Sequence, residues 1–229
     1  MSDALTTNPD SPGLIYQPPP PAPLHYWHVD ADLLLVEKPS GLLSVPGRGP
    51  DKADCLLSRV QQDFPEALVV HRLDMGTSGL LLLARHLTAQ RALSRLFAGR
   101  AVYKRYVALV EGELQPESGE VNLPLLTDWP NRPRQKVDFE LGKPALTRFQ
   151  RLDHDPQRHC SRVALEPETG RSHQLRVHLL ALGHPILGDE LYGRGPEPRA
   201  SRLLLHAERL AFAHPLQAQQ IDCCSPAAF

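Results

Sequence analysis

The segment HRLDMGTSGL, residues 71–80, places a carboxylate in a polar turn between two apolar runs. Asp74 lies in this turn two residues after Arg72, and the small residues GTSG follow it closely. A carboxylate at the end of a strand, beside residues small enough to let a ligand approach, is suited to act as a nucleophile or a base. A guanidinium nearby favours the ionised form of such a carboxylate. An Asp in a Gly/Ser-rich turn is also typical of a turn-former that accepts backbone N–H groups, so the turn alone leaves both interpretations open.

A second segment, TGRSHQLRVHLLALGHPILGD at residues 169–189, has the spacing of a helix. Ser172 can cap a helix that ends at Gly183, with Leu175 on its apolar face. Arg176 follows beside that face, where its aliphatic stem can pack while its guanidinium stays available for a carboxylate or a phosphate. The segment therefore supplies a candidate cationic partner for an acidic group or for RNA.

Histidines and cysteines give no pattern of metal ligands. His173 and His178 are five residues apart, which does not match the i, i+4 spacing of a metal pair on a helix. We interpret them as hydrogen-bonding partners or RNA contacts. The cysteines lack a CxxC spacing, so we expect reduced thiols and no metal site; they are Cys55, Cys160, Cys223 and Cys224.

A third segment, YKRYVALV at residues 103–110, has the alternating side-chain pattern that is typical of a β-strand. Tyr106 and Lys104 would point to one face of this strand. A tyrosine beside cations can stack on a nucleobase. It can equally be a core tyrosine whose hydroxyl is hydrogen-bonded.

Local charge is more informative than net charge. The formal net charge is −1, so a nucleic-acid partner cannot be inferred from the whole molecule. Basic residues nevertheless gather in three places, and the stretch 75–110 contains no acidic residue. The three sets are Arg85, Arg91, Arg95, Arg100, Lys104 and Arg105; Arg132, Arg134 and Lys136; and Arg171 with Arg176. Charge segregated onto one face would allow a neutral protein to bind phosphates.

The remaining chain predicts a soluble α/β or α+β protein with a mixed sheet, and periodicity alone does not decide between the two classes. Hydrophobic residues make up 41% of the sequence, and no apolar run reaches the roughly 20 residues of a membrane span. Seven prolines in residues 1–23 predict an extended, poorly ordered tail, with a single domain over residues 24–229. No secretory signal is visible, so we expect a cytoplasmic protein. No apolar helix face is left over for a partner subunit, so we expect a monomer. Expected strands are 33–36, 68–70, 80–84, 103–110, 145–152, 163–165 and 203–212, and expected helices are 53–64, 88–97 and 172–183.

The turn HRLDMGTSG resembles the HRLDxxTSG signature of the RluA-type pseudouridine synthases. The similarity continues in the same order through four further segments, so it covers nearly everything from Tyr26 onward. These segments are KPSGLLSVPGR (38–48), KRYVALVEG (104–112), GRSHQLRVHLLALGHPILGDELYG (170–193) and RLLLHAERLAFAHP (202–215). The resemblance implies one catalytic domain with a mixed, mainly antiparallel sheet, flanking helices and a central cleft.

The resemblance also implies roles for individual residues. Asp74 corresponds to the catalytic aspartate, Tyr106 to the tyrosine that stacks on the target base, and Arg176 to the basic residue that pairs with the aspartate. Leu175 corresponds to the aliphatic residue beside this pair, and Arg72 to the arginine that fills the gap left by the flipped nucleotide. The residues expected to bind substrate are Arg72, Leu175, Arg171 and His173.

The implied activity is the isomerisation of uridine to pseudouridine, which needs no cofactor and no metal. The loop LTDWPNRPRQKV (126–137) and the lack of an S4-like N-terminal domain resemble members that act on two classes of RNA. The expected substrates are therefore loops of 23S ribosomal RNA and the anticodon stem-loop of transfer RNA. Two alternatives are a non-catalytic RNA-binding module of the same fold and a hydrolase such as a glycosidase. Most glycosidases need two positioned carboxylates, whereas the candidate turn holds one.

Overall fold

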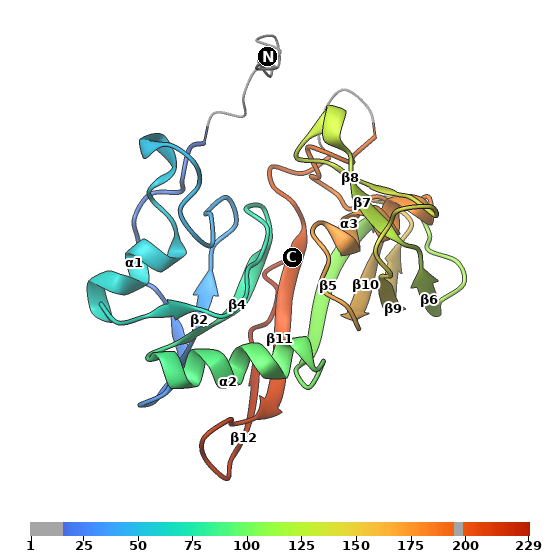
Figure 1. Ribbon diagram of the computed structural model, residues 1–229. Helices are drawn as coiled ribbons and strands as arrows, with labels where there is room; N and C mark the ends of the chain where they lie inside the picture. The colour runs from blue at the N-terminus through green and yellow to red at the C-terminus, as the bar shows by residue number, and fades with distance from the viewer. Residues whose placement is uncertain (1–15, 195–198) are drawn as a thin grey trace, which may run out of the picture.

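A ten-stranded mixed sheet forms the centre of the protein (Figure 1). The computed structural model describes residues 16–194 and 199–229. The main path of the sheet is β1-β2-β4-β11-β5-β10-β9-β6, with β12 paired to β11 and β3 paired to β4. Strands β4 and β11 run parallel and the other pairs are antiparallel, which confirms the expected mixed, mainly antiparallel sheet.

The strands of this sheet are β1 (Tyr26–Val29), β2 (Leu33–Lys38), β3 (Leu68–Val69), β4 (Ser78–Ala84), β5 (Tyr103–Glu111), β6 (Ser118–Asn122), β9 (Leu146–Asp155), β10 (Cys160–Pro167), β11 (Leu205–Ala213) and β12 (Gln220–Cys224). A separate two-stranded arm consists of β7 (Leu125–Thr127) and β8 (Gln135–Val137). The helices are α1 (Leu56–Asp63), α2 (Leu87–Ala98) and α3 (Gln174–Ala181), with short 3-10 turns at η1 (Pro50–Lys52) and η2 (Trp129–Asn131). Within the described residues, none of these helices has the length and apolar content needed to cross a bilayer.

Strand β4 is buried along its whole length because helices cover both of its faces. Side chains of a strand alternate between faces, so Leu80 and Leu82 pack in the cluster that contains Leu93 of α2. Leu81 and Leu83 point the other way, into the cluster that contains α1. A continuous apolar run, rather than an alternating one, is the pattern of a strand covered on both sides. The second half of the sheet has its own core, in which β5 and β10 pack against α3.

All three expected helix starts are wrong: α1, expected from residue 53, begins at Leu56 after its N-cap Cys55. Helix α2 begins one residue before Thr88, and the ring of His86 accepts the Ala89 N–H in place of a threonine cap. Helix α3 begins at Gln174, not at Ser172. Its N-cap is His173, which has a left-handed backbone and no side-chain cap. Tertiary contacts override local propensity at this end, since the Gln174 amide bonds with Thr147 and Thr169.

The N-terminal segment falls partly outside the described residues. Residues 1–15 of the expected tail lie outside them, whereas residues 16–23 lie against the domain. The Tyr16 hydroxyl donates to the Asp54 carbonyl at 2.9 Å, and the Arg59 guanidinium donates to the Pro19 carbonyl at 2.6 Å. Proline carbonyls remain good acceptors although proline has no N–H, so this stretch docks without strand pairing.

A glycine permits the parallel contact between β4 and β11. Gly79 has a φ of +110°, and an added Cβ would lie 2.3 Å from the Ala207 carbonyl oxygen. We expect Gly79→Ala to lower the free energy of unfolding by at least ~2 kcal/mol, because both the backbone angle and the contact become strained. Urea unfolding measures this. The control is Gly170→Ala, where an added Cβ meets nothing within 4 Å; equal stability of the two variants would contradict the prediction.

Candidate active site

A cleft of about 1590 Å³ brings together segments that are distant in the sequence. Its lining comes from residues 40–47 and 69–76 in the first half of the chain, and from residues 127–135 and 168–176 farther along. A smaller pocket of about 110 Å³ adjoins it and shares Asp74, Tyr106 and Arg176 with it. All seven predicted site residues line this smaller pocket: Arg72, Asp74, Tyr106, Arg171, His173, Leu175 and Arg176.

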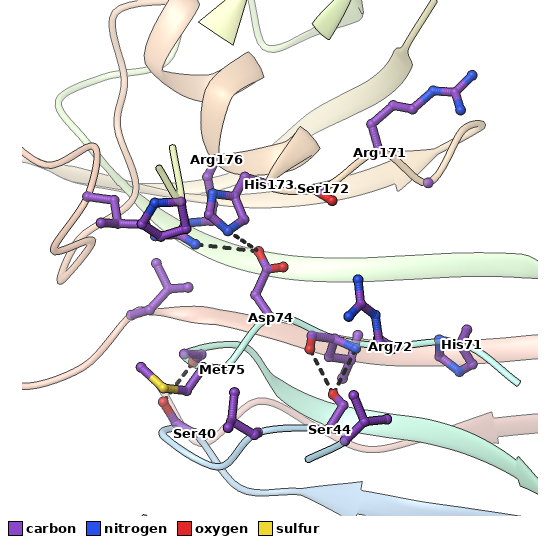
Figure 2. Close-up of a pocket in the computed structure, with 18 of the residues that line it drawn as sticks. Ser40, Ser44, His71, Arg72, Asp74, Met75, Arg171, Ser172, His173 and Arg176 are labelled. Atoms are coloured by element: carbon purple, nitrogen blue, oxygen red, sulfur yellow. Dashed lines mark hydrogen bonds and ion pairs between the residues drawn. The ribbon is translucent and has the colours of Figure 1, made fainter. Parts of the chain in front are cut away.

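Asp74 projects from the turn between β3 and β4 into this pocket (Figure 2). Its backbone carbonyl accepts the Thr77 N–H at 3.1 Å, which closes the turn. Among the described residues, no backbone N–H donates to its carboxylate. The Asp74 side chain is therefore not required to form the turn, in contrast to the alternative interpretation of Asp74 as a turn-former. Its Oδ2 lies 3.5 Å from Arg176 Nη1 and 4.0 Å from His173 Nε2.

The end of β2 and the loop after it hold the backbone of the turn that bears Asp74. The buried Lys38 ammonium donates to the Met75 carbonyl at 3.0 Å, and Ser40 Oγ donates to the Gly76 carbonyl at 2.7 Å. Ser44 Oγ both donates to the Leu73 carbonyl and accepts the Leu73 N–H. Burial lowers the pKa of Lys38 to about 7, and the Asp74 charge acts in the opposite direction. These contacts fix the turn through its backbone and leave the Asp74 carboxylate available.

Arg176 is held by a carboxylate that sequence reasoning missed. Its Nε and Nη2 donate to the two oxygens of Asp189, each at 2.7 Å, in the planar bidentate geometry that arginine favours. Asp189 is buried and also accepts the N–H groups of Leu191 and Tyr192. Burial lowers the pKa of Arg176, but Asp189 and Asp74 together shift that pKa upward. The guanidinium is therefore oriented by Asp189 and presents Nη1 to Asp74.

A chain of hydrogen bonds also orients His173. The Gln135 N–H donates to the Tyr192 hydroxyl oxygen at 2.7 Å, and this hydroxyl lies 2.8 Å from His173 Nδ1. Within the described residues, His173 Nδ1 is the acceptor that the Tyr192 hydroxyl can donate to. Because Nδ1 accepts this bond, the neutral His173 ring carries its own proton on Nε2. Burial lowers the pKa of His173, which keeps the ring neutral at pH 7. The ring thus presents an N–H toward Asp74, beside the guanidinium.

Tyr106 and Leu175 form the apolar wall of the smaller pocket. Tyr106 packs against the core cluster that contains Leu175. Burial raises the pKa of Tyr106, and the nearby Asp74 charge raises it further, so the phenol stays protonated at neutral pH. The two expected arginines lie toward solvent: both Arg72 and Arg171 are exposed at the cleft. Arg171 is anchored by a bond from Nε to the Pro144 carbonyl at 3.1 Å.

A histidine at the cleft predicts how stability depends on pH. His71 stacks on Phe97 with ring centroids 4.5 Å apart, and its Nε2 accepts the Leu82 N–H at 3.0 Å. Burial, together with the nearby charge of Lys104, lowers the pKa of His71 from 6.5 to about 3. Below pH 6.5, His71 is therefore protonated in the unfolded chain but stays neutral in the folded protein. This difference makes the free energy of unfolding decrease as the pH falls from 6.5 toward 3.

Urea unfolding between pH 4 and pH 7 tests this prediction. We expect His71→Gln, whose amide oxygen can still accept the Leu82 N–H, to show a shallower decrease in stability than the unsubstituted protein. Parallel curves for the two proteins would remove His71 from this role.

One group of possible metal ligands lies outside the cleft. Within the described part of the chain, Asp30, Asp32 and His214 place ligand atoms within 4.8 Å of one another. His214 Nδ1 accepts the Leu216 N–H at 3.2 Å, so the neutral ring carries its proton on Nε2 and turns an N–H toward the two carboxylates. A metal ligand needs a lone pair at that nitrogen, so the group does not fit a metal as it stands.

The fold agrees with what comparison with known proteins shows. Residues 32–181 match the model of the RNA pseudouridylate synthase family. The chain belongs to this family of RNA-modifying isomerases, which confirms the expected resemblance.

Individual relatives extend the likeness over nearly the whole chain. The sequence is 50% identical over 216 residues to the dual-specificity RNA pseudouridine synthase RluA of Escherichia coli (strain K12), covering 93% of this chain and 98% of that protein. It is 51% identical to the protein of the same name from Pasteurella multocida, with the same coverage. Among solved structures, human RNA pseudouridylate synthase domain containing 1 aligns with a TM-score of 0.74 and 32% identity, covering 94% of this chain and 86% of that one.

Proposed function

We propose that this enzyme isomerises uridines in loops of two RNA classes, 23S ribosomal RNA and the anticodon stem-loop of transfer RNA. The observation that carries the catalytic assignment is Asp74, which lies in the cleft 3.5 Å from a guanidinium that is itself fixed by Asp189. The dual-specificity name of relatives 50% identical over 93% of the chain supports the choice of substrates. We further propose a monomeric, cytoplasmic enzyme whose catalytic domain begins near residue 24.

The reaction breaks the N1–C1′ bond of uridine, forms a C5–C1′ bond, moves the C5 hydrogen off the ring and leaves a hydrogen on N1. In the proposal Asp74 acts on the reacting nucleotide, Tyr106 stacks on the uracil, and Arg176 keeps the carboxylate ionised. The target must leave its stack, which costs a few kcal/mol and least in a loop. Stacking on Tyr106 returns about 1–3 kcal/mol of this cost.

Basic residues at the cleft support an RNA substrate. Each of the three basic sets places at least one side chain at the cleft, but not all of their members lie there. Arg85 pairs with Glu66 and Lys136 pairs with Asp138, whereas other basic side chains face the cleft. Those that line it, apart from Arg176, are Lys52, Arg72, Arg100, Lys104, Arg132, Arg171 and Arg202. In the proposal, this rim binds phosphates while Arg72 occupies the space vacated by the flipped uridine.

Release of tritium from RNA labelled at uracil C5 tests the proposal, because forming the C5–C1′ bond expels that hydrogen. Transcripts of 23S ribosomal RNA and of transfer RNA serve as separate substrates. Release from both supports the dual specificity, and release from one alone restricts the substrate to that class. Bound but unchanged RNA would favour a non-catalytic RNA-binding module, and free uracil would indicate a hydrolase.

A further inference from the structure

The arm made of β7 and β8 carries an exposed tryptophan beside the cleft. Trp129, in η2, is 64% exposed, whereas Trp27 is less exposed and donates its indole N–H to Glu37. Figure 1 shows this arm and its short helical turn at the top of the half that contains α3. Four residues of the arm line the cleft itself: Thr127, Arg132, Pro133 and Gln135. Trp129 therefore stands next to the rim of the active site without belonging to the pocket already described.

The turn that presents Trp129 is closed by its own backbone. The Asp128 N–H donates to the Arg134 carbonyl, and the Asn131 N–H donates to the Asp128 carbonyl, each at 3.0 Å. The Asn131 amide also donates to the Asp128 carboxylate at 2.9 Å. The Gln135 bond to Tyr192 ties the base of the arm to the loop that follows Asp189. A ligand that binds the indole thus meets a side chain whose backbone is already ordered, which reduces the entropic cost of binding.

Charge indicates which ligand fits. The Arg132 guanidinium lies 4.6 Å from the centroid of the Trp129 ring and covers one face of the indole. Among the described residues, neither Arg132 nor Arg134 forms an ion pair with a carboxylate, so both cations remain available for phosphates. An exposed aromatic face next to a free guanidinium is the combination that binds single-stranded nucleotides, with the base on the ring and the phosphate on the cation.

We propose that Trp129 and Arg132 form a subsite for an unpaired nucleotide that flanks the target uridine, with its base on the uncovered indole face and its phosphate at the guanidinium. This inference rests on the proposed RNA substrate and adds a binding position outside the catalytic pocket. Loops supply such unpaired nucleotides, so the subsite favours loop RNA over uniform duplex.

The chain contains two tryptophans, which permits a direct readout. In the variant Trp27→Phe/Asp74→Asn, Trp129 is the remaining fluorophore and the RNA is not converted. We expect a stem-loop transcript of the transfer RNA anticodon arm to quench this fluorescence saturably, whereas a blunt duplex of equal length quenches it much less. Saturable binding of the stem-loop, measured by filter retention, without any change in fluorescence would overturn the proposal.

Kinetics supply the second test. We expect Trp129→Ala to raise KM for the stem-loop by about 5- to 150-fold, as expected for losing one base stack, with kcat at saturating RNA unchanged. Trp129→Phe should restore most of the affinity. Phe139→Ala is the matched control, because Phe139 is 77% exposed and follows the end of β8 by two residues but lies beside Asp138 and Glu140.

The outcomes separate this inference from the proposed function. Normal tritium release with an unchanged KM for Trp129→Ala overturns the subsite and leaves the isomerase standing. No release by the unsubstituted protein would instead count against the proposed function. Equal losses in Trp129→Ala and Phe139→Ala would show a general effect on the arm and would also overturn the subsite.

Discussion

Replacing Asp74 by asparagine is expected to abolish isomerisation and to leave RNA binding close to that of the unsubstituted enzyme. Asparagine has nearly the same shape, and the turn is closed by the Asp74 backbone carbonyl rather than by its carboxylate. Arg176 keeps its bidentate bonds to Asp189, so the site stays assembled. What disappears is the charged oxygen that we propose to act on the nucleotide, and we expect turnover to fall by at least ~10³-fold.

Single-turnover tritium release with enzyme in excess, combined with filter binding, measures both quantities. Glu190→Gln is the matched control, because Glu190 lines the same cleft and makes no ion pair among the described residues. We expect that variant to keep most of its activity. Turnover by Asp74→Asn within tenfold of the unsubstituted enzyme would refute the catalytic assignment.

The second large effect is expected at Asp189, which does not act on the nucleotide. Asp189→Asn removes the charge of the buried, bidentate partner of Arg176 and leaves only the longer contact to Asp74, and breaking a buried ion pair costs about 3–5 kcal/mol. The guanidinium also loses the contact that orients Nη1 toward Asp74, so we expect kcat to fall by ~10-fold or more. Thermal or urea unfolding and tritium release together measure the two effects.

A surface pair with similar geometry provides the control for Asp189. Arg209 Nε donates to Asp222 Oδ1 at 2.8 Å, and Arg209 Nη2 also donates to this carboxylate, but both side chains are largely exposed. Asp222→Asn should change neither stability nor activity noticeably, because exposed ion pairs contribute little. A double variant, Arg176→Met/Asp189→Leu, should regain stability and remain inactive. A stable and fully active Asp189→Asn protein would show that Asp189 does not position Arg176.

Local patterns in the sequence located seven of the twelve strands that the structure describes and the turn that bears Asp74, but they missed β1, β6, β7, β8 and β12. A contiguous apolar run such as 80–84 is visible without tertiary information, and the signature around Asp74 is also contiguous in the sequence. Helix starts were predicted less well. The cap of α3 is not Ser172, because the Gln174 amide is engaged by β9 and by Thr169, and no local propensity contains that information.

The residues that orient Arg176 and His173 could not be predicted either, because their contacts depend on tertiary packing. Asp189 lies 13 residues after Arg176, beyond the end of α3 and a turn, and its partner is defined by tertiary packing alone. Tyr192 reaches His173 in a similar way, across 19 residues. Asp189 and Tyr192 both lie in the segment 170–193 that carried the resemblance. The sequence signal that could have indicated Asp189 is a carboxylate shortly after a helix that bears an arginine. The mutual placement of these groups is a property of the fold.

The position of β11 has a consequence for how the enzyme folds during its synthesis. During translation β4 and β5 leave the ribosome well before β11, yet β11 lies between them, with His206 opposite Ser78 and Val107. The turn that bears Asp74 and the strand that bears Tyr106 therefore reach their final separation only after β11 has been synthesised. A nascent chain that has not yet delivered β11 has two unpaired strand edges and no assembled site. The site is thus assembled only after β11 has emerged from the ribosome and paired with both neighbours.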